Sequence, residues 1–273
     1  MNQDLVLTVA LPVTLFCIMF GMGAKLTLDD FRRLGGTPRA IAAGIASQMV
    51  LLPALALLTV SLFHLPSEIM VGFMILAFSP GGTVSNLFSY LARGNVALSV
   101  SLTALVSLIT PVSLPLLSAV VLEWQIGRTQ EVNLPIGPTF ITLVVVTLIP
   151  VVLGMLLRHY RPAFCNRHGN LLAGISVAML ALVIVYVIHQ NWEVMPDFLQ
   201  LVGAPALLLA SFALLGGYLF ARGLRQSVRD ARTVAIETGI QNGGTAMLVT
   251  GTILNSPTMT IAPAMYGVLV FVP

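Results

Sequence analysis

The sequence contains very little charge. Aspartate, glutamate, lysine and arginine together make up 8% of its 273 residues, whereas hydrophobic residues make up 57% and the mean hydropathy is +0.97. A soluble globular domain carries about 25% charged residues. So few charged side chains cannot cover the core of a chain this long, and the composition therefore excludes a water-soluble domain. It predicts an all-α protein that crosses a lipid bilayer several times.

Cysteine, histidine and clusters of metal-binding side chains are also scarce. The two cysteines are Cys17, in an apolar run, and Cys165, in a polar segment, which argues against a disulfide and against a cysteine metal site. The four histidines lie near the ends of apolar runs and away from carboxylates, so a zinc site is not expected. No Gly-x-Ser-x-Gly motif, aspartate pair or metal-ligand cluster occurs within the apolar runs. These shortages predict that the protein is not an enzyme and has no organic cofactor.

What the sequence has in abundance is long apolar runs. A helix needs about 20 apolar residues to cross the hydrocarbon core of a bilayer. The polar segments between the runs are too short to hold a soluble domain. We therefore predict one transmembrane transporter-like domain over residues 1–273, with about nine transmembrane helices. Their approximate ranges are 5–22, 40–63, 69–92, 95–122, 134–157, 171–189, 198–221, 231–253 and 258–273.

The basic residues are distributed unevenly over the loops between these runs. Alternate loops hold 12 of the 13 lysines and arginines, and only Arg128 lies on the opposite side. Loops rich in lysine and arginine face the cytoplasm. The pattern predicts a multi-pass protein of the plasma (inner) membrane, with the N-terminus outside and the C-terminus in the cytoplasm. The net charge of +3 therefore indicates the lipid bilayer as the partner, and neither nucleic acid nor an obligate protein partner is expected.

One run is interrupted by polar residues and glycines. The stretch AIETGIQNGG, residues 235–244, contains Glu237, the one acidic residue placed well inside an apolar run. Glu237 follows Arg232 by five positions, so an interfacial glutamate that reaches back to the cytoplasmic surface is one interpretation. The glycines and amides favour another, because they weaken a helix and leave polar groups that hydrocarbon cannot satisfy. This interpretation is a broken helix that faces a cavity.

A second run contains a matching interruption. The stretch FSPGGTVSNLF, residues 78–88, shares the tripeptide Gly-Gly-Thr with the first, as Gly81-Gly82-Thr83 and Gly243-Gly244-Thr245. By the order of the spans, the two interrupted runs cross the membrane in opposite directions. Two such breaks in corresponding places are typical of an inverted-repeat transporter with its site where the breaks meet. The repeats are predicted at approximately 1–124 and 133–273, as five spans plus five with the first helix missing.

At these motifs the sequence resembles the bile acid:sodium symporter family. The resemblance rests on GMGAKLTLDDF (21–31), SPGGTVSNLFSYLARGNVALSVSLTAL (79–105) and AIETGIQNGGTA (235–246). It implies a core domain and a panel domain, with two broken helices that cross in the middle of the membrane. It also implies sodium-coupled symport of a small organic anion by alternating access, with two sodium sites and one substrate site.

The resemblance assigns residues to those sites. One sodium site is expected at Ser85, Asn86, Ser99, Thr103 and Glu237. A second is expected at Gln48, Glu237 and Gln241, with backbone carbonyls near Thr238 and Ile240. Thr83 and Asn242 are expected to contact the substrate, beside half-helix N-termini that follow Gly82 and Gly244 and favour an anion. All the side chains of the sodium sets offer oxygen, as a hard cation requires.

The last run departs from the family. Several relatives have a His-Asn pair there that faces the substrate, whereas this chain reads MYGVLVFVP over residues 265–273. This departure puts recognition of bile acids in doubt, and the sequence leaves the substrate open among bile acids, pantothenate-like compounds, keto acids and sulfonates. The run holds fewer residues than a span requires, so a longer chain is expected.

Two function classes remain besides the excluded enzyme. The preferred one is the sodium-coupled importer of an organic anion. The alternative is a proton-coupled carrier or a sodium/proton exchanger of related fold, in which Glu237 would titrate. The glycine pairs at 81–82 and 243–244 are expected to keep two crossing backbones close, because glycine has no Cβ and free access to positive φ. Ala181 is expected to be a neutral position in an ordinary span.

Overall fold

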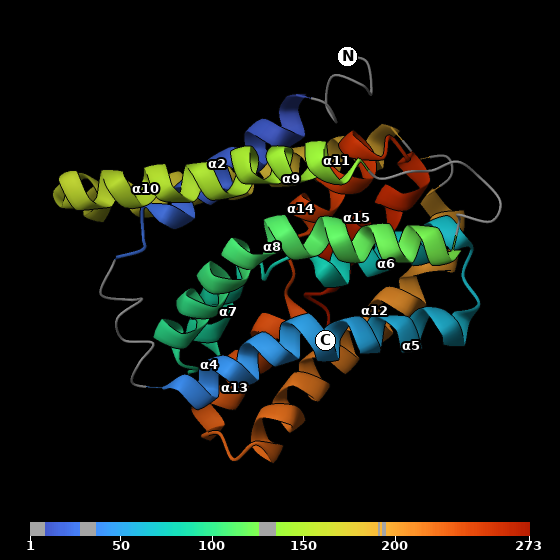
Figure 1. The fold of residues 1–273 in the computed structure, drawn as a ribbon, viewed down its shortest axis with the longest axis horizontal. Coiled ribbons are helices and arrows are strands. Elements are labelled where there is room, and N and C mark those ends of the chain that lie inside the picture. The colour runs from blue at the N-terminus through green and yellow to red at the C-terminus, as the bar shows by residue number, and fades with distance from the viewer. Residues whose placement is uncertain (1–8, 28–36, 126–134, 191, 193–194) are drawn as a thin grey trace.

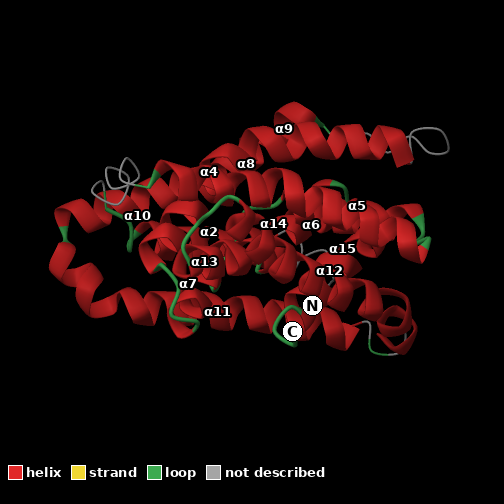
Figure 2. Cartoon of the chain, turned by 90° about the horizontal axis from the view of Figure 1, so that it is seen from below, coloured by secondary structure: helices red, strands yellow, loops and turns green. Residues whose placement is uncertain are grey.

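The computed structural model describes residues 9–27, 37–125, 135–190, 192 and 195–273, and in these residues the chain is helical (Figure 2). Three segments of π-helix, named η, continue α-helices without a break. In chain order the elements are α2 (Leu11–Gly23), α4 (Pro38–Ala46), η3 (Ser47–Leu51), α5 (Leu52–Phe63), α6 (Ser67–Phe78), α7 (Ser85–Leu91), α8 (Val96–Gln125), α9 (Ile136–Leu143), η4 (Val144–Leu148), α10 (Ile149–Tyr160), α11 (Pro162–Gln190), α12 (Met195–Gly223), α13 (Val228–Gly239), α14 (Gly243–Met247), η5 (Leu248–Ile253) and α15 (Pro257–Leu269).

The helices follow from the apolar composition, because a helix satisfies its backbone hydrogen bonds internally and a bilayer core cannot. Within the described residues, four helices are long and apolar enough to cross a membrane, and they span 38–63, 96–125, 136–160 and 196–223. Shorter apolar helices are Leu11–Gly23 and Ser67–Phe78. The structure thus agrees with an all-α membrane protein, and the count of nine spans stays a prediction.

The helices form two groups. Helices α2, α9, α10 and α11 lie together along the upper edge of Figure 1, and α2 packs against both α10 and α11. Gly23 of α2 and Gly154 of α10 bring these two helices into close contact, because a Cβ at either glycine would collide with the backbone of the other helix. The remaining helices form the second group, in which α12 packs against α13 and α15, and α15 packs against α6.

Both of the runs predicted to be broken are broken. The chain leaves helical geometry between Phe78 of α6 and Ser85 of α7, and again between Gly239 of α13 and Gly243 of α14. The second half-helix begins at Gly243, so Gly243 and Gly244 form its first turn. The prediction that this half-helix follows Gly244 was wrong by two residues. The reason is the side chain of Asn242, which accepts a hydrogen bond from the backbone N–H of Thr245 at 3.1 Å and so starts the helix earlier.

Candidate ion and substrate site at the helix breaks

The two breaks are hydrogen bonded to each other. The backbone N–H of Gly82 donates to the carbonyl of Ile240 at 2.8 Å, and the N–H of Asn242 donates to the carbonyl of Pro80 at 2.8 Å. Together these bonds form an antiparallel bridge between Gly81 and Gln241. They satisfy backbone groups that the helices have released, which is the condition for irregular backbone at membrane depth. Two segments about 160 residues apart in the chain are thereby fixed side by side.

The glycines at the crossing are needed for space. None of the described glycines has a positive φ, so the expected role of positive φ was wrong. A Cβ at Gly81 would lie 2.7 Å from Oε2 of Glu237 and 3.2 Å from Oε1 of Gln48. At Gly82 it would lie 3.1 Å from the carbonyl oxygen of Gln241, and at Gly243 it would lie 3.2 Å from that of Pro263. The absence of a side chain therefore permits the close approach.

Glu237 lies at the centre of the site and is completely buried. Its Oε1 accepts hydrogen bonds from the hydroxyls of Ser85 and of Ser99, the latter at 2.5 Å. Its Oε2 accepts from the hydroxyl of Thr103 at 2.9 Å. This position excludes the interpretation of Glu237 as an interfacial glutamate that reaches the cytoplasmic surface.

The five residues assigned to the first sodium site all belong to one network. The Ser99 hydroxyl also lies 2.9 Å from Oδ1 of Asn86, the fifth member. Ser99 and Thr103 are one helical turn apart on α8 and present their hydroxyls on the same face. Ser85 and Asn86 begin α7, directly after the first break. Three elements, α7, α8 and α13, therefore converge on one carboxylate.

The residues assigned to the second sodium site include two buried carboxamides, Gln48 and Gln241. Gln48 is 2% exposed, and neither its amide oxygen nor its amide nitrogen has a hydrogen-bond partner among the described residues. Its Oε1 borders Gly81, as does Oε2 of Glu237. Oε1 of Gln241 is likewise buried and has no partner in the described part of the chain. Oxygens of Gln48 and Glu237 thus lie beside Gly81, and Gln241, which pairs with Gly81 in the bridge, carries a further oxygen without a partner among the described residues.

The backbone carbonyls expected in that second set already accept hydrogen bonds. The amide nitrogen of Gln241 donates to the carbonyl of Glu237 at 2.8 Å and to that of Thr238 at 2.9 Å. The carbonyl of Ile240 accepts from Gly82, as described above. A carbonyl oxygen has two lone pairs, so each of these groups retains capacity for a further contact.

One neighbour of this set was missed at the level of sequence. The hydroxyl of Ser47 lies 2.7 Å from that of Thr238, which also donates to the carbonyl of Val234 at 2.7 Å. Ser47 and Gln48 open the π-helix η3, and such segments occur frequently at functional sites. The only signal for Ser47 in the sequence was its place beside Gln48 in an apolar run.

The chemistry of the site favours a hard monovalent cation. The partners that the described residues give Glu237 are neutral hydroxyls, and a buried carboxylate without a compensating positive charge is costly. Every other candidate ligand is a hydroxyl, carboxamide or carbonyl oxygen. Within the described residues no group of three histidines, cysteines or carboxylates could hold a metal ion, so a transition-metal site is not supported.

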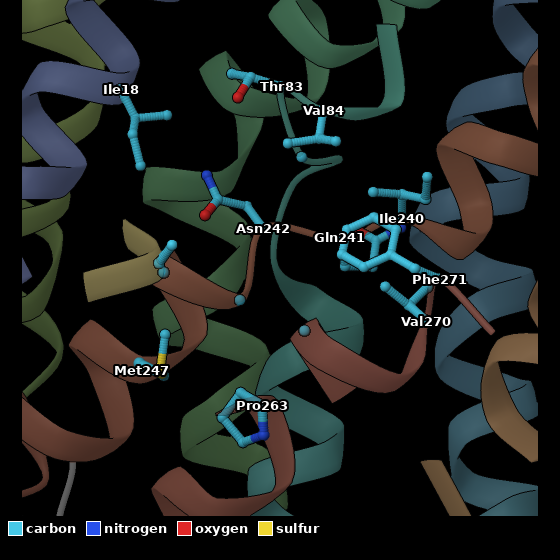
Figure 3. A pocket seen from close by; sticks show the side chains of 15 residues that line it. Ile18, Thr83, Val84, Ile240, Gln241, Asn242, Met247, Pro263, Val270 and Phe271 are labelled. Carbon is cyan, nitrogen blue, oxygen red and sulfur yellow. The ribbon is translucent and has the colours of Figure 1, made fainter. Parts of the chain in front are cut away.

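A pocket of about 830 Å³, partly open to solvent, adjoins the crossing (Figure 3). Both breaks contribute to it, together with Ile18 of α2, Ala181 of α11 and several residues of α15 and the chain after it. The pocket therefore lies between the two groups of helices. Ala181, expected to be a neutral position, also lines this pocket, and its neutrality stays a prediction.

Thr83 and Asn242, the predicted substrate contacts, both line the pocket (Figure 3). Oδ1 of Asn242 is occupied as the cap of α14, but its amide nitrogen is buried without a partner among the described residues. The hydroxyl of Thr245, in the first turn of α14, is likewise buried without a partner among the described residues. Asn242 therefore offers a hydrogen-bond donor at the edge of the pocket.

Apart from Thr83, Gln241 and Asn242, the side chains that line the pocket are apolar. Among the described residues that line it, none is charged, and α15 with the following residues contributes Pro263, Gly267, Val270 and Phe271. The ring of Phe271 stacks on that of Phe88 of α7, with 5.3 Å between the ring centroids. Such a wall suits a ligand with an apolar part, and leaves recognition of its polar part to neutral donors.

Comparison with known proteins agrees with this geometry. The model of the Sodium Bile acid symporter family matches residues 12–198. The chain is 32% identical over 261 residues to the uncharacterized sodium-dependent transporter YocS of Bacillus subtilis (strain 168). The aligned region covers 94% of this chain and 78% of that protein.

Two further relatives come from other kingdoms. The probable sodium/metabolite cotransporter BASS1, chloroplastic, of Arabidopsis thaliana is 36% identical, over 84% of this chain and 56% of that longer protein. The hepatic sodium/bile acid cotransporter of Rattus norvegicus is 28% identical, over 99% of this chain and 73% of that protein. The protein belongs to the sodium bile acid symporter family, a family of membrane transporters and not of enzymes.

Proposed function

We propose that this protein is a secondary active transporter that couples the inward movement of sodium to the uptake of a small organic anion. It would lie in the plasma (inner) membrane with its N-terminus outside and its C-terminus in the cytoplasm, as the basic loops indicate. The whole chain would act as one transmembrane domain of two inverted repeats. Sodium is a co-substrate in this proposal, and no obligate protein partner is required.

The observation that carries the proposal is the environment of Glu237. A fully buried carboxylate, held by three neutral hydroxyls from two other helices, forms an anionic oxygen cage. A sodium ion would join Ser85, Asn86, Ser99 and Thr103 to Glu237 and neutralise its charge. The hydroxyls that now donate to the carboxylate would turn their lone pairs toward the ion.

A second sodium is supported by polar atoms that have no partner among the residues the structure describes. The side chains of Gln48 and Gln241 place unpartnered oxygens beside the crossing, and desolvating such groups without a partner is unfavourable. An ion held by Gln48, Glu237, Gln241 and the carbonyls of Thr238 and Ile240 would satisfy them. Glu237 would then be shared by both ions.

The position of the pocket supports alternating access. The substrate would lie between the group α2, α9–α11, which corresponds to a panel domain, and the remaining helices, which correspond to a core domain. Thr83 and Asn242 would donate hydrogen bonds to its anionic end, while the wall formed by Val270 and Phe271 would cover an apolar part. Relative movement of the two domains would open the pocket to each side of the membrane in turn.

A sodium titration of the purified protein tests the proposal. Sodium that binds only the folded state at about 100 times its dissociation constant should raise the free energy of unfolding by about 2.7 kcal/mol, and potassium should not. Glu237→Gln keeps the shape of the side chain but removes its charge, so the sodium effect on the melting temperature should disappear. A sodium effect that persists in this variant would contradict the shared carboxylate.

Asp230→Asn is the matched control. Asp230 lies on the same helix, α13, and its carboxylate accepts a hydrogen bond from the Asn95 side chain at 2.8 Å, outside the ion site. The substitution makes the same chemical change and should leave the sodium response intact, even if it lowers stability in potassium. Equal loss of the response in both variants would show that the effect reflects net charge and not a sodium site.

A further inference from the structure

The hydroxyl of Tyr266 is linked to the second helix break. Tyr266 lies on α15, is fully buried, and donates a hydrogen bond to the carbonyl of Gly239 at 2.7 Å. Gly239 is the last residue of α13, and the last carbonyls of a helix have no partner within it. Tyr266 therefore supplies a donor that α13 itself cannot provide.

Gly239 occupies a sensitive position in the chain. It lies between Thr238 and Ile240, whose carbonyls are assigned to the second sodium site, and two residues after Glu237. The carbonyls of Glu237 and Thr238 accept from the Gln241 amide, and that of Ile240 accepts from Gly82. The bond from Tyr266 thus ties this series of peptide groups to the last helix, as the bond from Gly82 ties it to the first break.

Helix α15 also lines the proposed substrate pocket and contacts the half-helices α6 and α14. Pro263 and Gly267 line the pocket, and the carbonyl of Pro263 would lie 3.2 Å from a Cβ at Gly243 of α14. On another face, α15 packs closely on α6, where a Cβ at Gly72 would lie 3.2 Å from the Cβ of Ala262. One helix therefore touches the pocket, α6, the start of α14 and the end of α13.

We propose that Tyr266 is a positioning residue that fixes the carbonyls of the second sodium site and couples them to the α15 wall of the substrate pocket. This inference rests on the proposed sodium-coupled transport. The phenol holds the peptide group between Gly239 and Ile240 in one orientation before sodium arrives. A ligand that packs against α15 changes the position of Tyr266 and hence the affinity for sodium, and by linkage sodium changes the affinity for that ligand.

Removal of the hydroxyl should weaken sodium binding without removing any ligand. In Tyr266→Phe the aromatic ring still fills the same space, but the Gly239 carbonyl loses its donor. The peptide group can then turn, so sodium must order it on binding. The sodium concentration that gives half-maximal stabilisation should rise roughly threefold to tenfold, the equivalent of one net hydrogen bond.

Thr260→Val supplies the control for a merely structural effect. Thr260 lies on the same helix, is 4% exposed, and bonds to the hydroxyl of Thr250 at 3.0 Å and to the carbonyl of Ser256 at 2.9 Å, away from the breaks. Both variants lose a buried hydroxyl, so both should melt at a lower temperature in potassium. Only Tyr266→Phe should shift the sodium midpoint.

The experiment is a titration of melting temperature with sodium chloride, at constant ionic strength in choline chloride, for the wild type and both variants. An unchanged midpoint in Tyr266→Phe, or an equal shift in Thr260→Val, would overturn the positioning role while leaving sodium binding established. Absence of a sodium effect in the wild type would instead refute the proposed function. If a variant is too unstable in detergent, protection from trypsin against sodium concentration in membrane vesicles gives the same midpoints.

Discussion

A methyl group at position 81 would enter the site at its most crowded point. In Gly81→Ala the new Cβ would lie 2.7 Å from Oε2 of Glu237, whereas ordinary contact begins at 3.4 Å. The carboxylate oxygen must therefore retreat by roughly 0.7 Å, because sub-contact distances are repulsive. The backbone does not oppose the substitution, since Gly81 has no positive φ. Crowding of Glu237 is thus the main consequence.

The strain should fall mainly on the sodium-bound state. Without sodium the Glu237 side chain can turn away from the methyl group, but with sodium its oxygens must stay at ligand distance. Overpacking of a well-packed site costs about 1–3 kcal/mol, which corresponds to roughly a 5-fold to 150-fold rise in the sodium concentration for half-maximal stabilisation.

A melting-temperature titration with sodium chloride at constant ionic strength measures this concentration. Gly137→Ala is the control, because nothing lies within 4 Å of a Cβ at that position of α9. Its sodium midpoint should equal that of the wild type. If Gly81→Ala also kept the wild-type midpoint, the carboxylate oxygen beside Gly81 would not be a sodium ligand, and the reasoning would be refuted.

Three further expectations concern the ligands and the driving ion. Ser99→Ala should raise the sodium midpoint roughly fivefold to tenfold by removing an oxygen from the cage. Ser101→Ala should leave it unchanged, because the Ser101 hydroxyl bonds to the carbonyl of Ala97 at 2.7 Å and not to Glu237. Equal effects of the two substitutions would contradict the assignment. Gln48→Met should raise the free energy of unfolding in potassium by about 1–3 kcal/mol, because it removes an unpartnered buried amide, while it reduces the further stabilisation by sodium. Destabilisation in potassium would count against the second site. In proteoliposomes, uptake of a carboxylate or sulfonate that stabilises the protein in sodium should follow a sodium gradient. Uptake driven by a pH gradient in sodium-free buffer would favour the proton-coupled alternative.

Much of the local structure could be predicted from the sequence. The interruptions at Pro80–Gly82 and at Gly239–Gly243 break their helices where the sequence places proline, glycine and amides in apolar runs. The importance of Glu237 also followed from local context, because a single carboxylate deep in an apolar run requires a polar environment. The start of α14 was misplaced by two residues, since the cap formed by Asn242 decides it.

The partners of those residues could not be predicted from local patterns. The crossing depends on bonds from Gly82 to Ile240 and from Asn242 to Pro80, between segments that share no local signal for pairing. The role of Gly81 was expected from its missing Cβ and from its access to positive φ. The nearness of Glu237 and Gln48 agrees with the first reason, and the absence of a positive φ contradicts the second. Tyr266 and Ala181 look like ordinary members of apolar helices, and only packing reveals that one reaches Gly239 and the other lines the pocket.

The sequence by itself therefore determined that the chain lies in a lipid bilayer, that it forms helices, and where two of these helices break. These properties depend on the hydropathy and backbone propensities of neighbouring residues, which act within one segment. The tertiary structure alone decided how the two breaks meet, which hydroxyls surround Glu237, and which helix holds Gly239. Those features depend on contacts between segments far apart in the chain, where a difference of less than 1 Å decides between a collision and a ligand.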